Sequence, residues 1–216
     1  MDIGRAFSAI FEDQDWIKKV LMGGLFFLLI VTIPASIGYA LRWVRGIVEG
    51  DDRRLPEWDN FGELWIQGLV AICILFLWAL PGALLSRIPC AGAVLGILWQ
   101  IATMFVFAYI WVRFATTQNF SVAFEFQEMI AYIQGNIGNV ALAVIMQIVF
   151  SLAASLGVIA LIIGVAWTGF FALLASSHIY AQAWRSYYQT PAAPAFAGVP
   201  PAGAPPTEPP PPPPAM

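Results

Sequence analysis

Long runs of apolar residues separated by short polar segments cover most of the chain, and this pattern predicts helices that cross a membrane. A spanning helix needs about 20 predominantly apolar residues. Four segments approach or exceed that length: 64–86, 91–112, 137–155 and 158–181. The last two lie in a stretch from Met129 to Trp184 that contains no Asp, Glu, Lys or Arg. We therefore expect an all-α fold, that of a polytopic helical membrane protein.

A fifth apolar element precedes these segments, and a proline interrupts it. The apolar character extends over Lys19–Val48, with Pro34 near the middle. Proline removes a backbone donor and clashes with the preceding turn, so a helix kinks or breaks there. We interpret residues 16–48 as a re-entrant hairpin that enters and leaves the bilayer on one side. The alternative is a single span, which would give five plain spans.

Positive charges in short loops favour the hairpin, because Lys and Arg accumulate on the cytoplasmic side of membrane proteins. With a re-entrant hairpin, Arg87 alone among the ten Lys and Arg residues lies outside. With five plain spans, the same residues divide almost evenly between the two sides. The hairpin interpretation places both termini in the cytoplasm of a prokaryotic cell.

Two short segments outside the spans have apolar residues at helical spacing. Within 1–12 these are Ile3, Phe7, Ile10 and Phe11; within 121–135 they are Val122, Phe126, Met129, Ile130 and Ile133. We predict that both are amphipathic helices at the membrane interface. The alternatives are a frayed helix without a membrane role for the first and a connecting helix packed on the other helices for the second. The segment 121–135 and the polar loop 49–63 belong to a membrane domain over residues 13–186, which the helix 1–12 precedes.

The composition changes abruptly near the C-terminus. Most of the 16 prolines lie in residues 187–216, mixed with Ala and Gly. Such a segment cannot bury a core, so we predict a disordered or polyproline tail in the cytoplasm. Six prolines form an unbroken run that is a candidate ligand for a partner protein: Pro209, Pro210, Pro211, Pro212, Pro213 and Pro214. The alternative is a solubilising tether.

Overall composition excludes several classes of function. The chain is 60% hydrophobic and 11% charged, with 10 basic and 13 acidic residues, so it lacks the basic surface of a nucleic-acid-binding protein. Cys73 and Cys90 are too few for a disulfide scaffold or a cysteine-rich metal site. His178 is the single histidine and a poor metal ligand without partners. We predict no catalytic site, metal or cofactor.

Two groups of polar residues remain as candidates for a role. Gln100 and Gln147 are the deepest strongly polar side chains of the predicted spans, suited to hydrogen bonds between helices or to substrate contact. A basic group flanks the first element and is suited to contacts with anionic lipid headgroups: Lys18, Lys19, Arg42, Arg45, Arg53 and Arg54. The predicted spans contain no Asp, Glu, Lys or Arg, which disfavours an ion-coupled transporter.

Several motifs resemble a known family. They are Asp15-Trp16-Ile17-Lys18-Lys19, Gly23-Gly24, Gly38-Tyr39, Arg42, Arg45, Gly50, the run Leu55-Pro56-Glu57-Trp58-Asp59-Asn60-Phe61-Gly62-Glu63-Leu64, Gly68, and the closing Ser177-His178-Ile179-Tyr180-Ala181-Gln182-Ala183-Trp184. Over about residues 11–185 the chain resembles prokaryotic multipass membrane proteins, found in archaea and in bacteria such as the Chloroflexota, that are catalogued only as a domain of unknown function. The resemblance implies a membrane location and no particular activity.

These observations lead to two expectations for function. The first is a non-enzymatic accessory or scaffold subunit of a membrane assembly, which meets a membrane or cytoplasmic protein partner through its surface helices and tail. The alternative is an uncoupled transporter or channel for a small solute or lipid. Small residues at four-residue spacing, such as Gly92 and Gly96, allow close helix packing within one chain or self-association, and the sequence does not separate the two.

Overall fold

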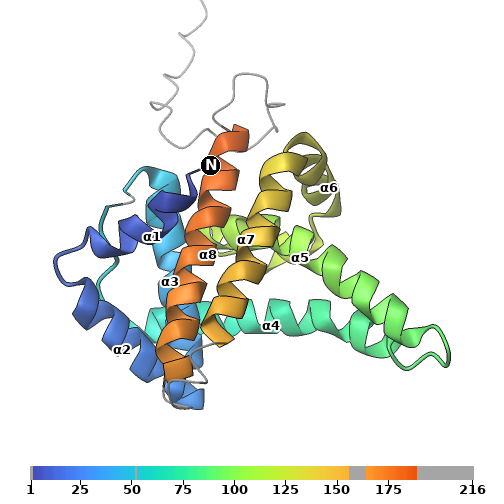
Figure 1. The fold of residues 1–216 in the computed structure, drawn as a ribbon, viewed down its shortest axis with the longest axis horizontal. Coiled ribbons are helices and arrows are strands. Elements are labelled where there is room, and N and C mark those ends of the chain that lie inside the picture. Colours follow the sequence, from blue (N-terminus) through green and yellow to red (C-terminus); the bar gives the residue numbers. More distant parts are fainter. Residues whose placement is uncertain (1, 52, 156–163, 189–216) are drawn as a thin grey trace, which may run out of the picture.

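The computed structural model of the chain describes residues 2–51, 53–155 and 164–188. Every regular element in these ranges is helical, as predicted (Figure 1). In chain order they are α1 (Ile3–Phe11), α2 (Trp16–Leu28), the 3₁₀ turn η1 (Ile30–Thr32), α3 (Ile33–Glu49), α4 (Phe61–Leu85), α5 (Gly92–Thr117), the 3₁₀ turn η2 (Phe120–Phe124), α6 (Phe126–Gly135), α7 (Ile137–Ser155) and α8 (Gly164–Tyr188).

The first hydrophobic element is broken close to its proline. Helix α2 ends at Leu28, and α3 begins at Ile33 with Pro34 in its first turn, where the missing N–H of proline costs nothing. The hydroxyl of Thr32 donates to the carbonyl oxygen of Phe26 at 2.6 Å and lies 2.9 Å from that of Leu29, so the end of α2 keeps hydrogen-bond partners. The break agrees with the predicted hairpin; its re-entry into a bilayer stays a prediction.

Helices α3 and α4 cross with their backbones in direct contact. A β-carbon added to Gly38 would lie 1.9 Å from the carbonyl oxygen of Leu64, and one added to Gly68 would lie 1.7 Å from that of Pro34. Only glycine permits this approach. Helix α3 ends at Glu49 and is followed by Gly50, whose φ of +104° is a left-handed conformation that glycine adopts readily.

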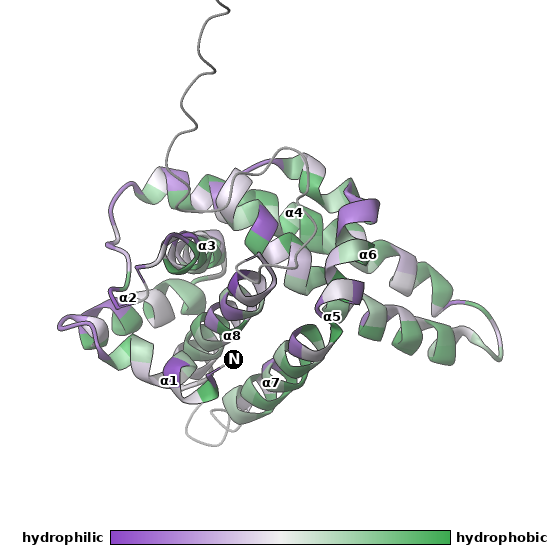
Figure 2. Cartoon of the chain, turned by 90° about the horizontal axis from the view of Figure 1, so that it is seen from above, coloured by the Kyte–Doolittle hydropathy of each residue, from purple (hydrophilic) through white to green (hydrophobic). Residues whose placement is uncertain are grey.

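Three helices in the described ranges are long and apolar enough to cross a membrane: α4, α5 and α7. Each agrees with a predicted span, although α5 continues past Arg113 to Thr117. In Figures 1 and 2 the outer part of the hairpin of α4 and α5 extends away from α7 and α8, and Figure 2 shows that most of its residues are hydrophobic. Its outer side chains, including Phe76, Leu84, Val94 and Ile97, are exposed, as lipid-facing side chains would be.

Helix α8 lies among the other helices and forms much of the core. Phe170, Leu174 and Ile179 have no exposed surface, and α8 contacts α1, α2, α3, α5 and α7. It covers most of the fourth predicted span, 158–181, whose first six residues lie outside the described ranges. A four-span topology therefore stays a prediction.

The two predicted surface helices are used for packing inside the protein. In α1, Ala6, Ala9 and Ile10 are buried, and the backbone N–H of Asp2 donates to Gln182 Oε1 of α8 at 2.7 Å. The apolar side of α1 therefore packs against the other helices of the protein. The interfacial position predicted for the helix stays a prediction.

The segment 121–135 is divided, where a single helix was predicted. The turn η2 and helix α6 meet at Glu125, whose backbone leaves helical geometry. The Oε2 atom of Glu125 accepts hydrogen bonds from Tyr109 at 2.6 Å and from Arg113 at 3.2 Å. These contacts tie the break to α5, so Val122 and Met129 are buried while Phe126 and Ile130 are exposed.

Candidate functional site

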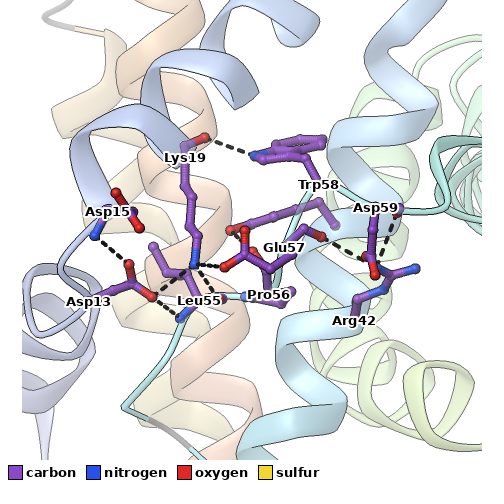
Figure 3. A network of polar contacts seen from close by, with 10 residues as sticks. Asp13, Asp15, Lys19, Arg42, Leu55, Pro56, Glu57, Trp58 and Asp59 are labelled. Carbon is purple, nitrogen blue, oxygen red and sulfur yellow. Dashed lines mark hydrogen bonds and ion pairs between the residues drawn. The ribbon is translucent and has the colours of Figure 1, made fainter.

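The residues of the N-terminal motifs meet where α2 begins and the loop between α3 and α4 passes over it. Figure 3 shows Lys19 pointing toward Asp13, Leu55 and Glu57. Its Nζ lies 3.0 Å from Asp13 Oδ2, 2.9 Å from the carbonyl oxygen of Leu55 and 2.6 Å from Glu57 Oε1. A lysine ammonium has three donors, and here each has an acceptor. The side chain of Lys19 therefore fastens the loop to α2.

Asp13 completes this contact from the other side. Its Oδ2 also accepts from the backbone N–H of Leu55 at 3.0 Å, and its Oδ1 accepts from that of Asp15 at 2.8 Å. Burial by itself raises the pKa of Asp13, but the hydrogen bonds from Lys19 and the backbone amides outweigh it and hold the pKa below its ordinary value. Burial lowers the pKa of Lys19, whereas Glu57 and Asp13 raise it, with a net increase.

A second set of contacts fixes the same loop to α3. Arg42 pairs with Asp59 and lies 3.6 Å from Glu63, and the hydroxyl of Tyr39 donates to the carbonyl oxygen of Pro56 at 2.8 Å. The ring of Trp58 stacks on Tyr39, with centroids 4.1 Å apart. Lys19 and Arg42, with their partners Asp13, Glu57 and Asp59, thus form a structural clamp on the loop. Neither basic side chain points freely toward solvent.

These contacts divide the six basic residues that were candidates for headgroup binding into exposed residues and residues with partners inside the protein. Lys18, Arg53 and Arg54 are exposed and keep that candidate role. Lys19 and Arg42 belong to the clamp, and Arg45 donates through Nε to the carbonyl oxygen of Ala115 in α5 at 2.8 Å. The acidic and carbonyl partners come from segments distant in the sequence, so spacing alone could not reveal them.

The motif glycines pack α2 and α3 against their neighbours. A β-carbon on Gly23 would lie 2.1 Å from the ring of Phe170, and one on Gly24 would lie 2.2 Å from the ring of Trp167, both in α8. The indole N–H of Trp167 donates to the carbonyl oxygen of Leu21 at 3.1 Å. Together with Gly38 and Gly68, these positions show that four of the motif glycines serve close helix contact.

The feature most suited to binding a molecule is a pocket lined by residues of α2, α3, α4, α5, α7 and α8. Its volume is about 510 Å³, and its walls are mainly apolar. A second pocket of about 460 Å³ adjoins it and shares Leu75, Phe107 and Gln147 with it. Gln100 also lines the second pocket. The structure therefore brings Gln100 and Gln147, the two polar candidates of the spans, to one pocket.

Gln147 has a neighbour in the first pocket that the sequence did not single out for a role. Tyr180 of α8 lines the same pocket and is 4% exposed. Within the described part of the chain, neither the hydroxyl of Tyr180 nor the Oε1 atom of Gln147 has a hydrogen-bond partner. Ser177, also in the wall, accepts from the indole N–H of Trp111 at 3.0 Å. Tyr180 and Ser177 belong to the closing motif, which was the one available signal.

The remaining candidates have simpler places in the structure. His178 is fully buried, and its Nδ1 lies 3.0 Å from Gln182 Nε2. Cys73 and Cys90 are free and exposed. Within the described ranges no group of three His, Cys, Asp or Glu side chains is placed to hold a metal ion. The run Pro209–Pro214 lies outside the described residues.

Comparisons with known proteins agree with the resemblance seen in the motifs. A search of curated proteins and a search of solved structures each gave no match. A family model described as a protein of unknown function, DUF4013, matches residues 21–165. This range contains the two close-contact glycines of the α3–α4 crossing, the loop held by the clamp, and the three helices able to cross a membrane. The chain belongs to the DUF4013 family.

Proposed function

We propose that the protein is a non-enzymatic, multipass protein of the prokaryotic cytoplasmic membrane that holds a small apolar or amphipathic molecule between its helices, without coupling to an ion. The observation that carries this proposal is the pocket of about 510 Å³ at the meeting point of six helices. A mostly apolar pocket with a few polar groups is the usual form of a small-molecule site. This supports the lipid- or solute-handling function that the sequence left as the alternative.

The chemistry of the walls supports an uncoupled mechanism. The pocket is lined by hydrophobic side chains and by Gln, Ser and Tyr, and the described residues of its lining include no Asp, Glu, Lys, Arg or His. Coupled transporters commonly carry ionisable residues within the membrane as relays and coupling sites. A molecule held here is therefore bound by apolar contact and neutral hydrogen bonds.

Two adjacent alanines of α7 provide the test. Ala154 lines the pocket and Ala153 is exposed, so Ala154→Phe fills the pocket while Ala153→Phe adds the same side chain outside it. Each variant is purified in mild detergent and examined by native mass spectrometry. We expect a small molecule retained by the wild type and by Ala153→Phe and lost from Ala154→Phe. Equal retention by both variants, or none by the wild type, contradicts the proposal.

Transport is a further step that the same pocket permits. Proteoliposomes containing the wild type or Gln147→Leu are loaded with the molecule identified in this way, and its release is followed. We expect release through the wild type and slower release through the variant, because the variant loses a polar group of the pocket wall. Absence of release through the wild type would restrict the function to binding.

An accessory-subunit function is a second candidate, favoured by the hairpin of α4 and α5. The outer half of this hairpin extends away from α7 and α8 and exposes apolar side chains (Figures 1 and 2). Lipid or the helices of a partner protein can cover that surface. Affinity purification in mild detergent, with the full chain and with a chain ending at residue 190, tests the candidate. A partner that covers the hairpin should remain with both chains, because both contain α4 and α5, whereas a partner that binds the proline-rich tail should be lost from the shorter one. Isolation of both chains alone contradicts the candidate.

A further inference from the structure

The pocket between the helices contains two polar atoms that lack a partner among the described residues. The hydroxyl of Tyr180 and the Oε1 atom of Gln147 are both buried, and neither makes a hydrogen bond there. Buried polar groups in proteins are nearly always paired, and each exception needs an explanation. The two residues come from different helices, α8 and α7, and line the same pocket. A molecule in the pocket can supply both missing partners.

The walls of the pocket determine the charge of such a molecule. The lining that the structure describes includes no charged side chain, so an ionised headgroup would be buried without a counter-ion. Removal of an unpaired ion from water is far more costly than removal of a hydroxyl. The ligand group that meets Tyr180 and Gln147 is therefore uncharged, and the pocket disfavours a carboxylate or phosphate at that position.

The hydrogen-bonding capacity of the two atoms restricts the class further. The Oε1 atom of Gln147 is an acceptor only, whereas the hydroxyl of Tyr180 can donate or accept. A ligand carbonyl or ether oxygen can accept from Tyr180 but leaves the Oε1 atom of Gln147 without a donor. A ligand hydroxyl can donate to that Oε1 atom and can also accept from a donor such as Tyr180. The ligand group that pairs with the Oε1 atom of Gln147 must therefore carry a proton.

The remaining walls and the volume define the body of the ligand. Phe27, Ile33, Ile37 and Phe107 provide apolar contact around the polar atoms. The volume of about 510 Å³ corresponds to roughly 17 water molecules at ~30 Å³ each, which suits one aliphatic chain. We propose that this pocket binds an uncharged, single-chain amphiphile bearing a hydroxyl group, of the class of long-chain alcohols and monoacylglycerols. This inference rests on the binding function proposed above and adds the chemical class of the ligand.

Photolabelling of the full chain tests the proposal. The protein is placed in nanodiscs of saturated phosphatidylcholine and labelled with a dodecanol that carries a diazirine at the far end of its chain; labelled residues are located by mass spectrometry. Competitors are 1-dodecanol, dodecyl methyl ether and dodecanoate. We expect labels on residues of the pocket wall. 1-Dodecanol should displace them about tenfold more effectively than dodecyl methyl ether, which is the equivalent of one hydrogen bond. Dodecanoate should compete less well than the ether, because its charge has no counter-ion in the pocket.

Two variants examine the polar atoms separately. Gln147→Leu removes the acceptor, so we expect 1-dodecanol and the ether to compete equally. Tyr180→Phe removes only an oxygen, and we expect weaker labelling in the pocket. Tyr132→Phe is the matched control, because Tyr132 is fully buried in α6 and outside the pocket; labelling should equal that of the wild type. Thermal unfolding of each variant confirms that it is folded.

The outcomes distinguish this inference from the proposed function. If the pocket is labelled but the ether or dodecanoate competes as well as 1-dodecanol in the wild type, the hydroxyl class is wrong and binding in the pocket stands. The hydroxyl class is equally wrong if Gln147→Leu and Tyr180→Phe both behave as the wild type. If the wild type carries no label on the pocket wall, the ligand class is wrong. Retention of a small molecule by the wild type and its loss from Ala154→Phe then decide the binding function independently.

Discussion

Substitution of Gly68 by alanine should separate helices that the native backbone holds in contact. A β-carbon at Gly68 would lie 1.7 Å from the carbonyl oxygen of Pro34, whereas one at Gly62, in the same helix, has nothing within 4 Å. The obstacle at Gly68 is backbone, which cannot rotate away as a side chain can. The α3–α4 contact must therefore open by more than about 1 Å to reach an ordinary van der Waals separation.

We expect Gly68→Ala to lower the free energy of unfolding and Gly62→Ala to leave it unchanged or raise it. Alanine gains about 1 kcal/mol over glycine inside a helix, and added volume in a packed contact costs typically 1–3 kcal/mol. A clash with backbone lies at the upper end of that range, so we expect Gly68→Ala to lose about 2 kcal/mol, roughly a thirtyfold change in the folding equilibrium. Gly62→Ala should be unchanged or stabilised by up to about 1 kcal/mol.

Equilibrium unfolding in mixed micelles of increasing dodecyl sulfate fraction, followed by circular dichroism, measures both variants. The comparison is internal, because both substitutions add one methyl group to the same helix. If Gly68→Ala unfolds at the same dodecyl sulfate fraction as Gly62→Ala, the close backbone contact does not constrain the fold and the reasoning is refuted.

Four further predictions concern the clamp, its titration, the sidedness of the chain and a buried hydrogen bond. Lys19→Met should destabilise the protein by about 3–5 kcal/mol in the same assay, because Asp13 is left buried without its counter-ion. Lys18→Met, at the exposed neighbouring position, should change the free energy of unfolding little; similar effects at both positions would contradict the clamp. The lowered pKa of Asp13 contributes stability that is present above its ordinary pKa of 3.8 and is lost as the pH falls through the native pKa. The raised pKa of Lys19 contributes stability that is present below its ordinary pKa of 10.5 and is lost as the pH rises through the native pKa. The unfolding temperature of the wild type should therefore fall at both acidic and alkaline pH, and the alkaline decrease should be smaller in Lys19→Met. In cells, a membrane-impermeant maleimide added from outside should label Cys90, in the turn predicted to face outward. It should not label an Arg53→Cys variant in which Cys73 and Cys90 are both replaced by alanine; labelling at position 53 would overturn the cytoplasmic loop and, with it, the re-entrant hairpin. Ser177→Ala should lose about 1 kcal/mol relative to the wild type, because the indole N–H of Trp111 is left without its acceptor at 3.0 Å; an unchanged unfolding midpoint would show that this bond contributes nothing.

The elements of this fold were predictable because their signals are local. The lengths of the apolar runs predicted the positions of α4, α5 and α7, and Pro34 predicted the break between α2 and α3. The division at Glu125 was missed, because its cause is contact with Tyr109 and Arg113 of another helix. Helical spacing in residues 121–135 carries no sign of that contact.

The candidate site was predictable only in part. Gln147 was identified as a deep polar residue, and the structure places it in a pocket wall. Tyr180 lies in the closing motif, but the sequence predicted no role for it in a pocket, since a tyrosine near the end of a predicted span is ordinarily an interfacial anchor. Its burial, and the absence of a partner for its hydroxyl among the described residues, depend on how α8 is surrounded by the other helices.

The sequence by itself determined that this chain is helical, that several of its helices suit a membrane, and that the first element breaks at a proline, because each of these follows from residues near one another in the chain. Only the tertiary structure decided which partners meet. Lys19 finds Glu57 across a loop, Gly68 lies against Pro34, and Gln147 shares a pocket with Tyr180. Such contacts depend on the crossing of helices, which the order of residues within one helix does not specify.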